Sequence, residues 1–212
     1  MNRKRLAVFA LIAVILPQLQ GCFPMVAAGA GTAALSITDR RTTGTQVEDE
    51  GIELRASNRI NESYGDKVHI NITSFNRSVL LTGEAPDAST RAGVEKIVMN
   101  VPTVRGVTNE IVVAGIASLP ARSNDSFLTS KVKARFVDAG KFNPVHVKVV
   151  TENSTVYLFG MVTQKEADAA VEIARTTGGV RKVVKIFEYC RESDEVCRPP
   201  QPPKPEPRKA GG

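Results

Sequence analysis

The 212-residue chain has few of the residues from which catalytic and metal sites are usually built. It contains only two histidines, His69 and His146, and three cysteines. It has no nucleophile-elbow motif, no zinc-protease motif, no phosphate-binding loop and no Cys-x-x-Cys pair. We therefore expect a protein that is not an enzyme and that uses no cofactor and no metal.

Long apolar runs are also scarce. The longest is LAVFALIAVIL, which follows the basic residues MNRKR at the start of the chain. Eleven residues are too few to cross a bilayer, and the pattern is typical of a secretory signal peptide over residues 1–21. The residues Leu19-Gln20-Gly21-Cys22 resemble a bacterial lipobox, which predicts lipid attachment at Cys22. The alternative is an ordinary signal peptide followed by a chance cysteine.

The residue after Cys22 is Phe23. In lipoproteins of the Gram-negative kind, Asp at this position is a common signal for retention in the inner membrane. Phe23 therefore favours a protein anchored by lipid in the outer membrane and facing the periplasm. Residues 22–48 are rich in Ala, Gly and Thr and are expected to be the tether between the lipid and the folded part.

Strong positive charge is missing as well. Loss of the signal peptide leaves 25 basic against 22 acidic residues, which is near +3. There is no basic stripe with interleaved aromatic residues, so a nucleic-acid partner is not expected. In an oxidising periplasm the remaining cysteines, Cys190 and Cys197, are expected to form a local disulfide. The proline-rich residues 191–212 are expected to be an extended tail.

The region between tether and tail is an internal repeat. His69 and His146 occupy equivalent places 77 residues apart, as do the strands that end at Gly83 and Gly160. Periodicity predicts the order α-β-β-α-β in each half, with helices over 49–63, 87–100, 124–139 and 164–177. We expect α/β (α+β) units in which two helices pack on one face of a three-stranded mixed sheet. The units span 49–115 and 124–190, joined by a linker at 116–123.

These patterns resemble a known family. NSTVYLFGMVTQKEADAAVEIARTTGGVRKVV, from Asn153, is similar to a BON domain, and the first half keeps VLLTGEAP and VRGVTNEIVV. Together with DRRTTGTQVEDEGIE and the lipobox, the chain resembles dual BON-domain outer-membrane lipoproteins. That resemblance implies two tandem BON domains, a role in outer-membrane integrity, envelope stress and cell division, and binding of anionic phospholipid by the second domain.

The first helix of the second unit suggests where lipid would bind. Spacing of about 100° per residue turns one apolar face inward and leaves a second cluster on the opposite face. The predicted phospholipid-binding residues are Phe127, Ser130, Lys131, Lys133, Ala134 and Val137. Apolar side chains flanked by lysines suit the boundary of an anionic bilayer. The equivalent positions of the first unit include Gly51, Asn58 and Asn61, so its outer face is expected to be polar.

Two alternatives remain open. The cluster around Phe127 and Val137 would equally suit packing against the first unit or the tether. The protein could also be a periplasmic adaptor that binds outer-membrane assembly factors or regulators of peptidoglycan hydrolases without touching lipid. The matching histidines are interpreted as a consequence of duplication, each pointing to the open face of its sheet. His146 is expected to share that face with Lys148, Tyr157 and Phe159.

Overall fold

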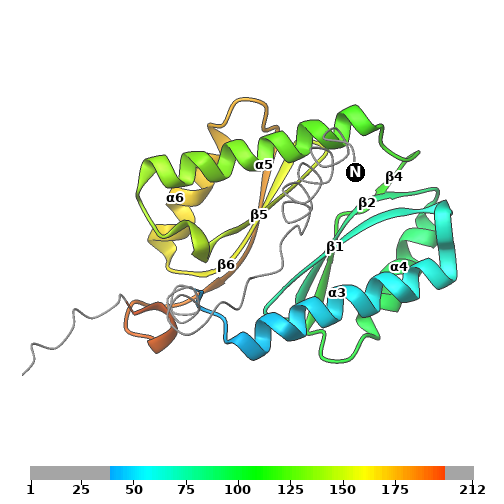
Figure 1. Cartoon of the computed structure of the whole chain (residues 1–212), viewed down its shortest axis with the longest axis horizontal. Helices are drawn as coiled ribbons and strands as arrows, with labels where there is room; N and C mark the ends of the chain where they lie inside the picture. Colours follow the sequence, from blue (N-terminus) through cyan, green and yellow to red (C-terminus); the bar gives the residue numbers. More distant parts are fainter. Residues whose placement is uncertain (1–38, 199–212) are drawn as a thin grey trace, which may run out of the picture. The chain divides into compact units, whose positions relative to one another are not determined.

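The computed structural model describes residues 39–198, and the expected lipid-attachment residue Cys22 and the tail beyond Arg198 lie outside this range. Two α-β-β-α-β units follow each other along the chain, as predicted (Figure 1). The elements of the first unit are α3 (Thr43–Tyr64), η2 (Gly65–Lys67), β1 (His69–Phe75), β2 (Ser78–Ala85), α4 (Ala88–Met99), β3 (Gly106–Asn109) and β4 (Val112–Val113). The elements of the second unit are α5 (Leu119–Ala139), η3 (Pro144–His146), β5 (Lys148–Glu152), β6 (Thr155–Val162), α6 (Gln164–Arg175), β7 (Lys182–Tyr189) and η4 (Glu195–Cys197).

Each unit contains one mixed sheet. In the first, β1 and β2 form an antiparallel hairpin, and β3 and β4 both run parallel to β2. In the second, β5 and β6 form the hairpin and β7 runs parallel to β6. The third strand of the first unit is divided into β3 and β4 because the N–H of Ile111 bonds to the Asn109 side chain instead of the sheet. Ile111 turns into the core there and is 2% exposed.

Helix α5 begins earlier than the sequence predicted. Its first residue is Leu119, not Asn124, and Pro120 stands at the first turn, where its missing N–H costs nothing. Part of the expected linker is therefore helical. The helix ends at Gly140, whose φ of 56° is left-handed and suits glycine. Helix α6 starts with a capping box between Thr163 and Glu166.

Equivalent apolar positions build the two cores. Both first helices bury the face that the repeat predicted, and the strands and second helices supply the rest. The residues that α3 and α5 contribute are Ile52, Ala56 and Ile60, and Leu128, Val132 and Phe136. The strands β2 and β6 continue two residues beyond Gly83 and Gly160, where the sequence predicted that they would end. Both glycines are required by close backbone approach. A Cβ at either position would lie 2.0 or 2.2 Å from the carbonyl oxygen of His69 or His146.

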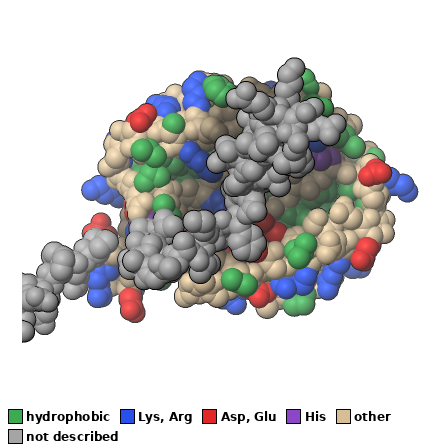
Figure 2. Space-filling view, in the orientation of Figure 1, with side chains coloured by type: hydrophobic (Ala, Val, Ile, Leu, Met, Phe, Trp, Pro, Cys, Tyr) green, Lys and Arg blue, Asp and Glu red, His purple; other side chains and the backbone are tan. Residues whose placement is uncertain are grey.

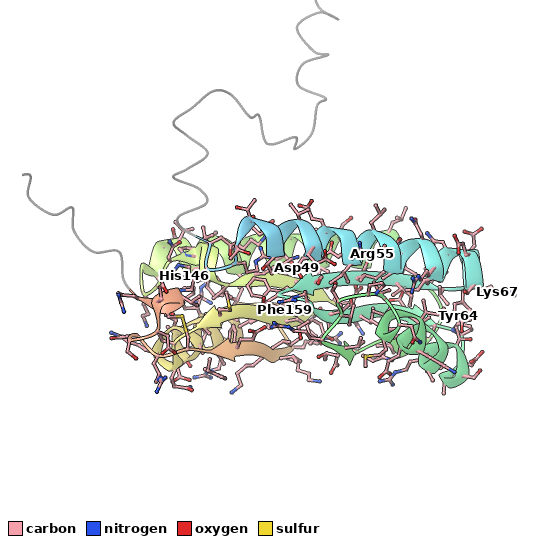
Figure 3. All side chains as sticks on the ribbon, turned by 90° about the horizontal axis from the view of Figure 1, so that it is seen from below. Asp49, Arg55, Tyr64, Lys67, His146 and Phe159 are labelled. Atoms are coloured by element: carbon pink, nitrogen blue, oxygen red, sulfur yellow. A yellow bond between two sulfur atoms is a disulfide. The ribbon has the colours of Figure 1, made fainter. Side chains whose placement is uncertain are left out.

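A buried aspartate ties each first helix to its own β-hairpin. In the first unit, Asp49 accepts hydrogen bonds from the backbone N–H groups of Asn76 and Arg77 at 2.8 and 2.7 Å. It lies on the side of α3 that faces the strands (Figure 3). In the second unit, Asp125 accepts from the N–H groups at positions 153 and 154, both at 2.8 Å. All four turn residues have positive φ, so the carboxylates hold two tight turns in shape.

The open faces of the two sheets pack against each other. Both units belong to one compact body, and an apolar cluster joins them. Its buried members are Phe75 and Leu80 from the first unit and Tyr157 and Phe159 from the second. The Phe75 and Phe159 rings are 6.3 Å apart.

Hydrogen bonds and an ion pair between the two units accompany this apolar contact. The Glu152 carboxylate accepts from the Asn71 side chain at 2.7 Å, and the Glu188 carboxylate accepts from Asn76 at 2.7 Å. Lys148 forms an ion pair with Glu53 at 3.4 Å. The sheet face expected to be open in the second unit is therefore covered by the first.

The histidines do not share one environment. His69 lies on β1 and contacts Glu84 on β2 at 3.1 Å. His146 is not on a strand, because the chain forms the 3₁₀ turn η3 before β5 begins at Lys148. Its ring contacts Glu166 at the start of α6, so the predicted position of His146 beside Tyr157 and Phe159 is wrong.

We predict that Asp125→Ala lowers the free energy of unfolding by about 2–3 kcal/mol, because two N–H groups of the turn lose a buried, charged acceptor. Urea unfolding followed by circular dichroism measures the change. Asp138→Ala, on the exposed side of the same helix, is the control and should stay within about 0.5 kcal/mol of the parent. Equal stability of the two variants would show that the turn does not depend on the carboxylate.

Candidate functional site

The outer face of α5 carries apolar side chains that no other part of the described chain covers. Phe127 is 64% exposed and Val137 is 65% exposed. Ser130 and Ala134 lie between them on the same face and are exposed too. We call these four residues the α5 stripe. Because the first unit packs on the opposite face of the second sheet, the alternative that it covers Phe127 and Val137 is wrong.

The two lysines beside the α5 stripe are not equivalent. The Lys131 ammonium donates to the carbonyl oxygen of Gly178 at 2.9 Å, just past the end of α6. Arg135 donates to the carbonyl oxygen of Ile173 at 2.9 Å and so also satisfies the end of that helix. Within residues 39–198, Lys133 forms no hydrogen bond or ion pair. Lys133 is thus the cation beside the α5 stripe that is free to meet an anion.

Helix α3 offers a comparison within the same molecule. The sequence predicted a polar outer face for this helix. That prediction is wrong, because Val47 and Leu54 are each 64% exposed. The charges differ, however. Helix α3 contains five acidic and two basic residues, whereas α5 contains two acidic and four basic residues. Figure 2 shows hydrophobic and basic side chains close together over the part of the surface where Figure 1 places α5. Of these two helices, α5 is the one that combines exposed apolar side chains with a net positive charge.

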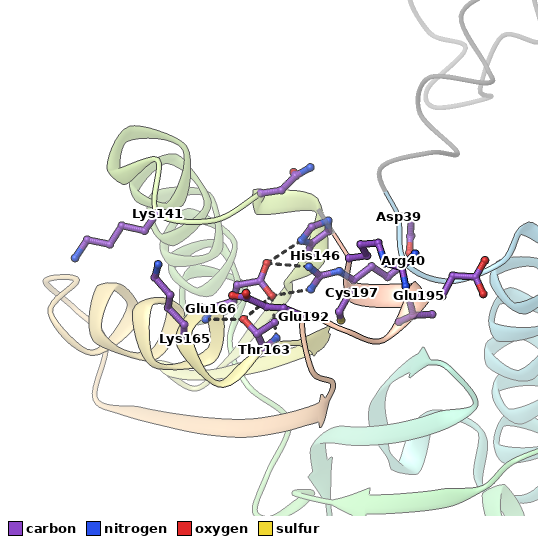
Figure 4. Close-up of a pocket in the computed structure, with 13 residues that line it drawn as sticks. Asp39, Arg40, Lys141, His146, Thr163, Lys165, Glu166, Glu192, Glu195 and Cys197 are labelled. Atoms are coloured by element: carbon purple, nitrogen blue, oxygen red, sulfur yellow. Dashed lines mark hydrogen bonds and ion pairs between the residues drawn. The ribbon is translucent and has the colours of Figure 1, made fainter. Parts of the chain in front are cut away.

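A second group of polar residues lies where η3 and the start of α6 meet the end of the second unit. It lines a cavity of about 630 Å³ between η3, the start of α6 and the loop that ends at Cys197 (Figure 4). Arg40 donates to both carboxylate oxygens of Glu166, at 2.7 and 3.0 Å, and to the carbonyl oxygen of Met161. Lys141 and Lys165 point away from this bond network. No motif or periodicity in the sequence predicted that Arg40 would contact a residue 126 positions away.

The Arg40 contacts perturb the acidity of Glu166. Burial alone raises the pKa of this carboxyl group, but hydrogen bonds from Arg40, the Thr163 N–H and His146 outweigh burial and lower the pKa to about 2. The next residue, Arg41, bonds to Asp49 at 2.9 Å and lies over the Phe75 ring at 4.3 Å. Consecutive arginines thus fasten the start of the folded chain to the second and the first unit.

The disulfide expected between Cys190 and Cys197 is present, with the two Cα atoms 6.2 Å apart. It closes the loop that forms one wall of the Arg40 cavity. Among the described residues, no three His, Cys, Asp or Glu side chains are grouped as a metal site would require. No helix within residues 39–198 is long and apolar enough to span a membrane.

Comparison with known proteins gives the class of the chain. The model of the BON domain family matches residues 48–115 and 124–191. The chain therefore belongs to the BON-domain family and contains two such domains, which correspond to the two units described above.

Two curated relatives narrow the class. The chain is 39% identical to the outer membrane lipoprotein DolP of Haemophilus influenzae, over 81% of this chain and 90% of that protein. It is 33% identical to the 21 kDa hemolysin of Actinobacillus pleuropneumoniae, over 71% of this chain and 79% of that protein. Among solved structures, the C-terminal domain of CdsD, a structural protein of the type III secretion system of Chlamydia trachomatis, is 12% identical to this chain with a TM-score of 0.28. The match covers 69% of this chain and 98% of that domain. The protein is a dual BON-domain outer-membrane lipoprotein.

We predict that Arg40→Ala lowers the free energy of unfolding at neutral pH by about 1–3 kcal/mol, because it removes charge-assisted bonds to a partly buried carboxylate. Glu166 has a lowered pKa in the folded protein. The stabilisation that its carboxylate gives to the folded state is therefore complete above about pH 4.5 and is lost as the pH falls toward 2. The difference between parent and variant should shrink over that range in urea titrations. Arg175→Ala, which breaks an exposed pair with Glu172, is the control and should have little effect.

Proposed function

We propose that this lipoprotein binds anionic phospholipid through α5 of its second BON domain, without catalysis, and thereby supports outer-membrane integrity, envelope-stress resistance and cell division. The observation that carries the proposal is the α5 stripe, in which exposed apolar residues lie on a helix of net positive charge. The resemblance to a lipoprotein supports it, because lipid attached at Cys22 would keep α5 close to a bilayer.

The physical basis is an interfacial helix. Phe127 and Val137 can leave water for the boundary between headgroups and acyl chains, which is favourable for apolar surface. The core face of α5 remains packed on the sheet, so the helix does not have to fold or turn to bind. The free ammonium of Lys133 can meet a phosphate, and each such cation contributes about 1 kcal/mol at an anionic surface.

The Phe127→Ala, Val137→Ala double variant should lose most of its association with vesicles that contain phosphatidylglycerol, because it removes the largest apolar groups of the α5 stripe. Flotation of a protein comprising residues 23–212, which lacks the lipid-attachment cysteine, measures this association. Val47→Ala, Leu54→Ala removes equally exposed groups from α3 and should bind as the parent does. If instead the α5 variant binds vesicles normally but no longer retains an envelope protein, α5 is an adaptor surface for protein partners.

Lys133→Glu should weaken binding to the same vesicles by roughly thirtyfold, since reversing a charge worth about 1 kcal/mol changes the binding free energy by about 2 kcal/mol. The effect should fade as salt is added. Lys131→Glu should weaken binding less than Lys133→Glu, because the parent ammonium is engaged with Gly178. A larger effect at Lys131 would contradict the assignment of Lys133 as the lipid-facing cation.

A further inference from the structure

The segment that joins the two BON domains is a second place where apolar side chains gather at the surface. The chain leaves β4 and enters α5 through residues 112–119 (Figure 1). Four large apolar residues of this segment are exposed, at 46%, 48%, 50% and 74%, and we call them the linker strip: Val112, Val113, Ile116 and Leu119. Exposed apolar residues so close together mark a contact surface.

The linker strip is almost free of charge. Residues 111–124 contain no acidic residue and a single basic one, Arg122. The Arg122 guanidinium donates to the carbonyl oxygen of Ala117 at 3.1 Å, which holds the turn against the start of α5. Nothing within this segment would repel an anionic surface, and its one cation would favour such a surface.

The linker strip is continuous with the α5 stripe. Leu119 and Val137 are eighteen residues apart on one helix, which is five complete turns, so both point to the same side at about 27 Å along the axis. Phe127 lies within about 80° of them. Serines separate these apolar groups along the helix, and apolar groups spread over this length match a flat bilayer better than the short groove that a peptide would fill.

The backbone of the linker strip is suited to a less polar environment as well. Val112 and Val113 pair with Glu84 and Ala85 of β2, and the Ala114 N–H donates to the Ala85 carbonyl oxygen at 3.1 Å. Part of the peptide hydrogen-bonding capacity is therefore satisfied within the sheet. This lowers the cost of moving the valine side chains away from water.

We infer that the linker strip enters the same anionic bilayer as the α5 stripe, so that the first BON domain is also held at the lipid surface. The inference rests on the proposed function of α5 and extends it. It names a lipid contact in the segment between the domains, and with two contacts the protein has one fixed orientation on the membrane. Leu119, at the junction, belongs to both surfaces.

A depth measurement on the full protein tests the inference. Single cysteines replace Ile116, Val137 or Leu54, and each is labelled with an environment-sensitive fluorophore; Cys190 and Cys197 are not labelled because they form a disulfide. The proteins are reconstituted in vesicles of phosphatidylethanolamine and phosphatidylglycerol that contain spin-labelled lipid as quencher. We expect quenching at positions 116 and 137 to be at least about twice that at position 54, which lies on acidic α3.

The outcomes separate the two claims. Quenching at 137 with a water-exposed label at 116 would overturn the linker contact and leave the proposed function intact. A water-exposed label at 137 would overturn the proposed function, whatever position 116 shows. In the protein labelled at 116, Leu119→Glu should return the label to water, since a carboxylate at the junction opposes insertion. A label that stays in lipid in that variant would overturn the assignment of Leu119 to the membrane contact, and circular dichroism verifies that the variant is folded.

Discussion

The packing of the two open sheet faces is the contact on which the rest of the structure depends. Each BON domain has helices on one face of its sheet and needs a cover for the other. Phe75 and Leu80 of one domain and Tyr157 and Phe159 of the next provide that cover for each other. Because the two open sheet faces cover each other in this way, the outer faces of the helices and the segment between the domains are among the described surfaces that can make outside contacts.

Duplication explains the shared features, and later divergence explains the functional ones. Both domains keep the buried aspartate, the tight hairpin turn and the glycine within the second strand, because each of these is fixed by backbone geometry. The outer faces of α3 and α5 carry no such constraint. The two helices now carry opposite net charge, and the proposed contact of α5 with an anionic membrane rests on that difference.

The start of the folded chain connects the expected lipid anchor to both domains. Arg40 is bound to Glu166 and Arg41 to Asp49, so the described end of the expected tether is fixed at two points. The Arg41 bond also reaches the aspartate that shapes the first hairpin turn.

The sequence by itself determined the repeat, the order of elements and the core positions, because apolar periodicity and turn residues act over a few neighbouring positions. It also indicated the face of α5 that holds Phe127 and Val137. It did not show that α5 begins at Leu119, that Lys131 is engaged with Gly178, or that His146 contacts Glu166. The two contacts join residues that are 47 and 20 positions apart along the chain. Only the tertiary structure decided them, because long-range contacts leave no periodic trace in a single sequence.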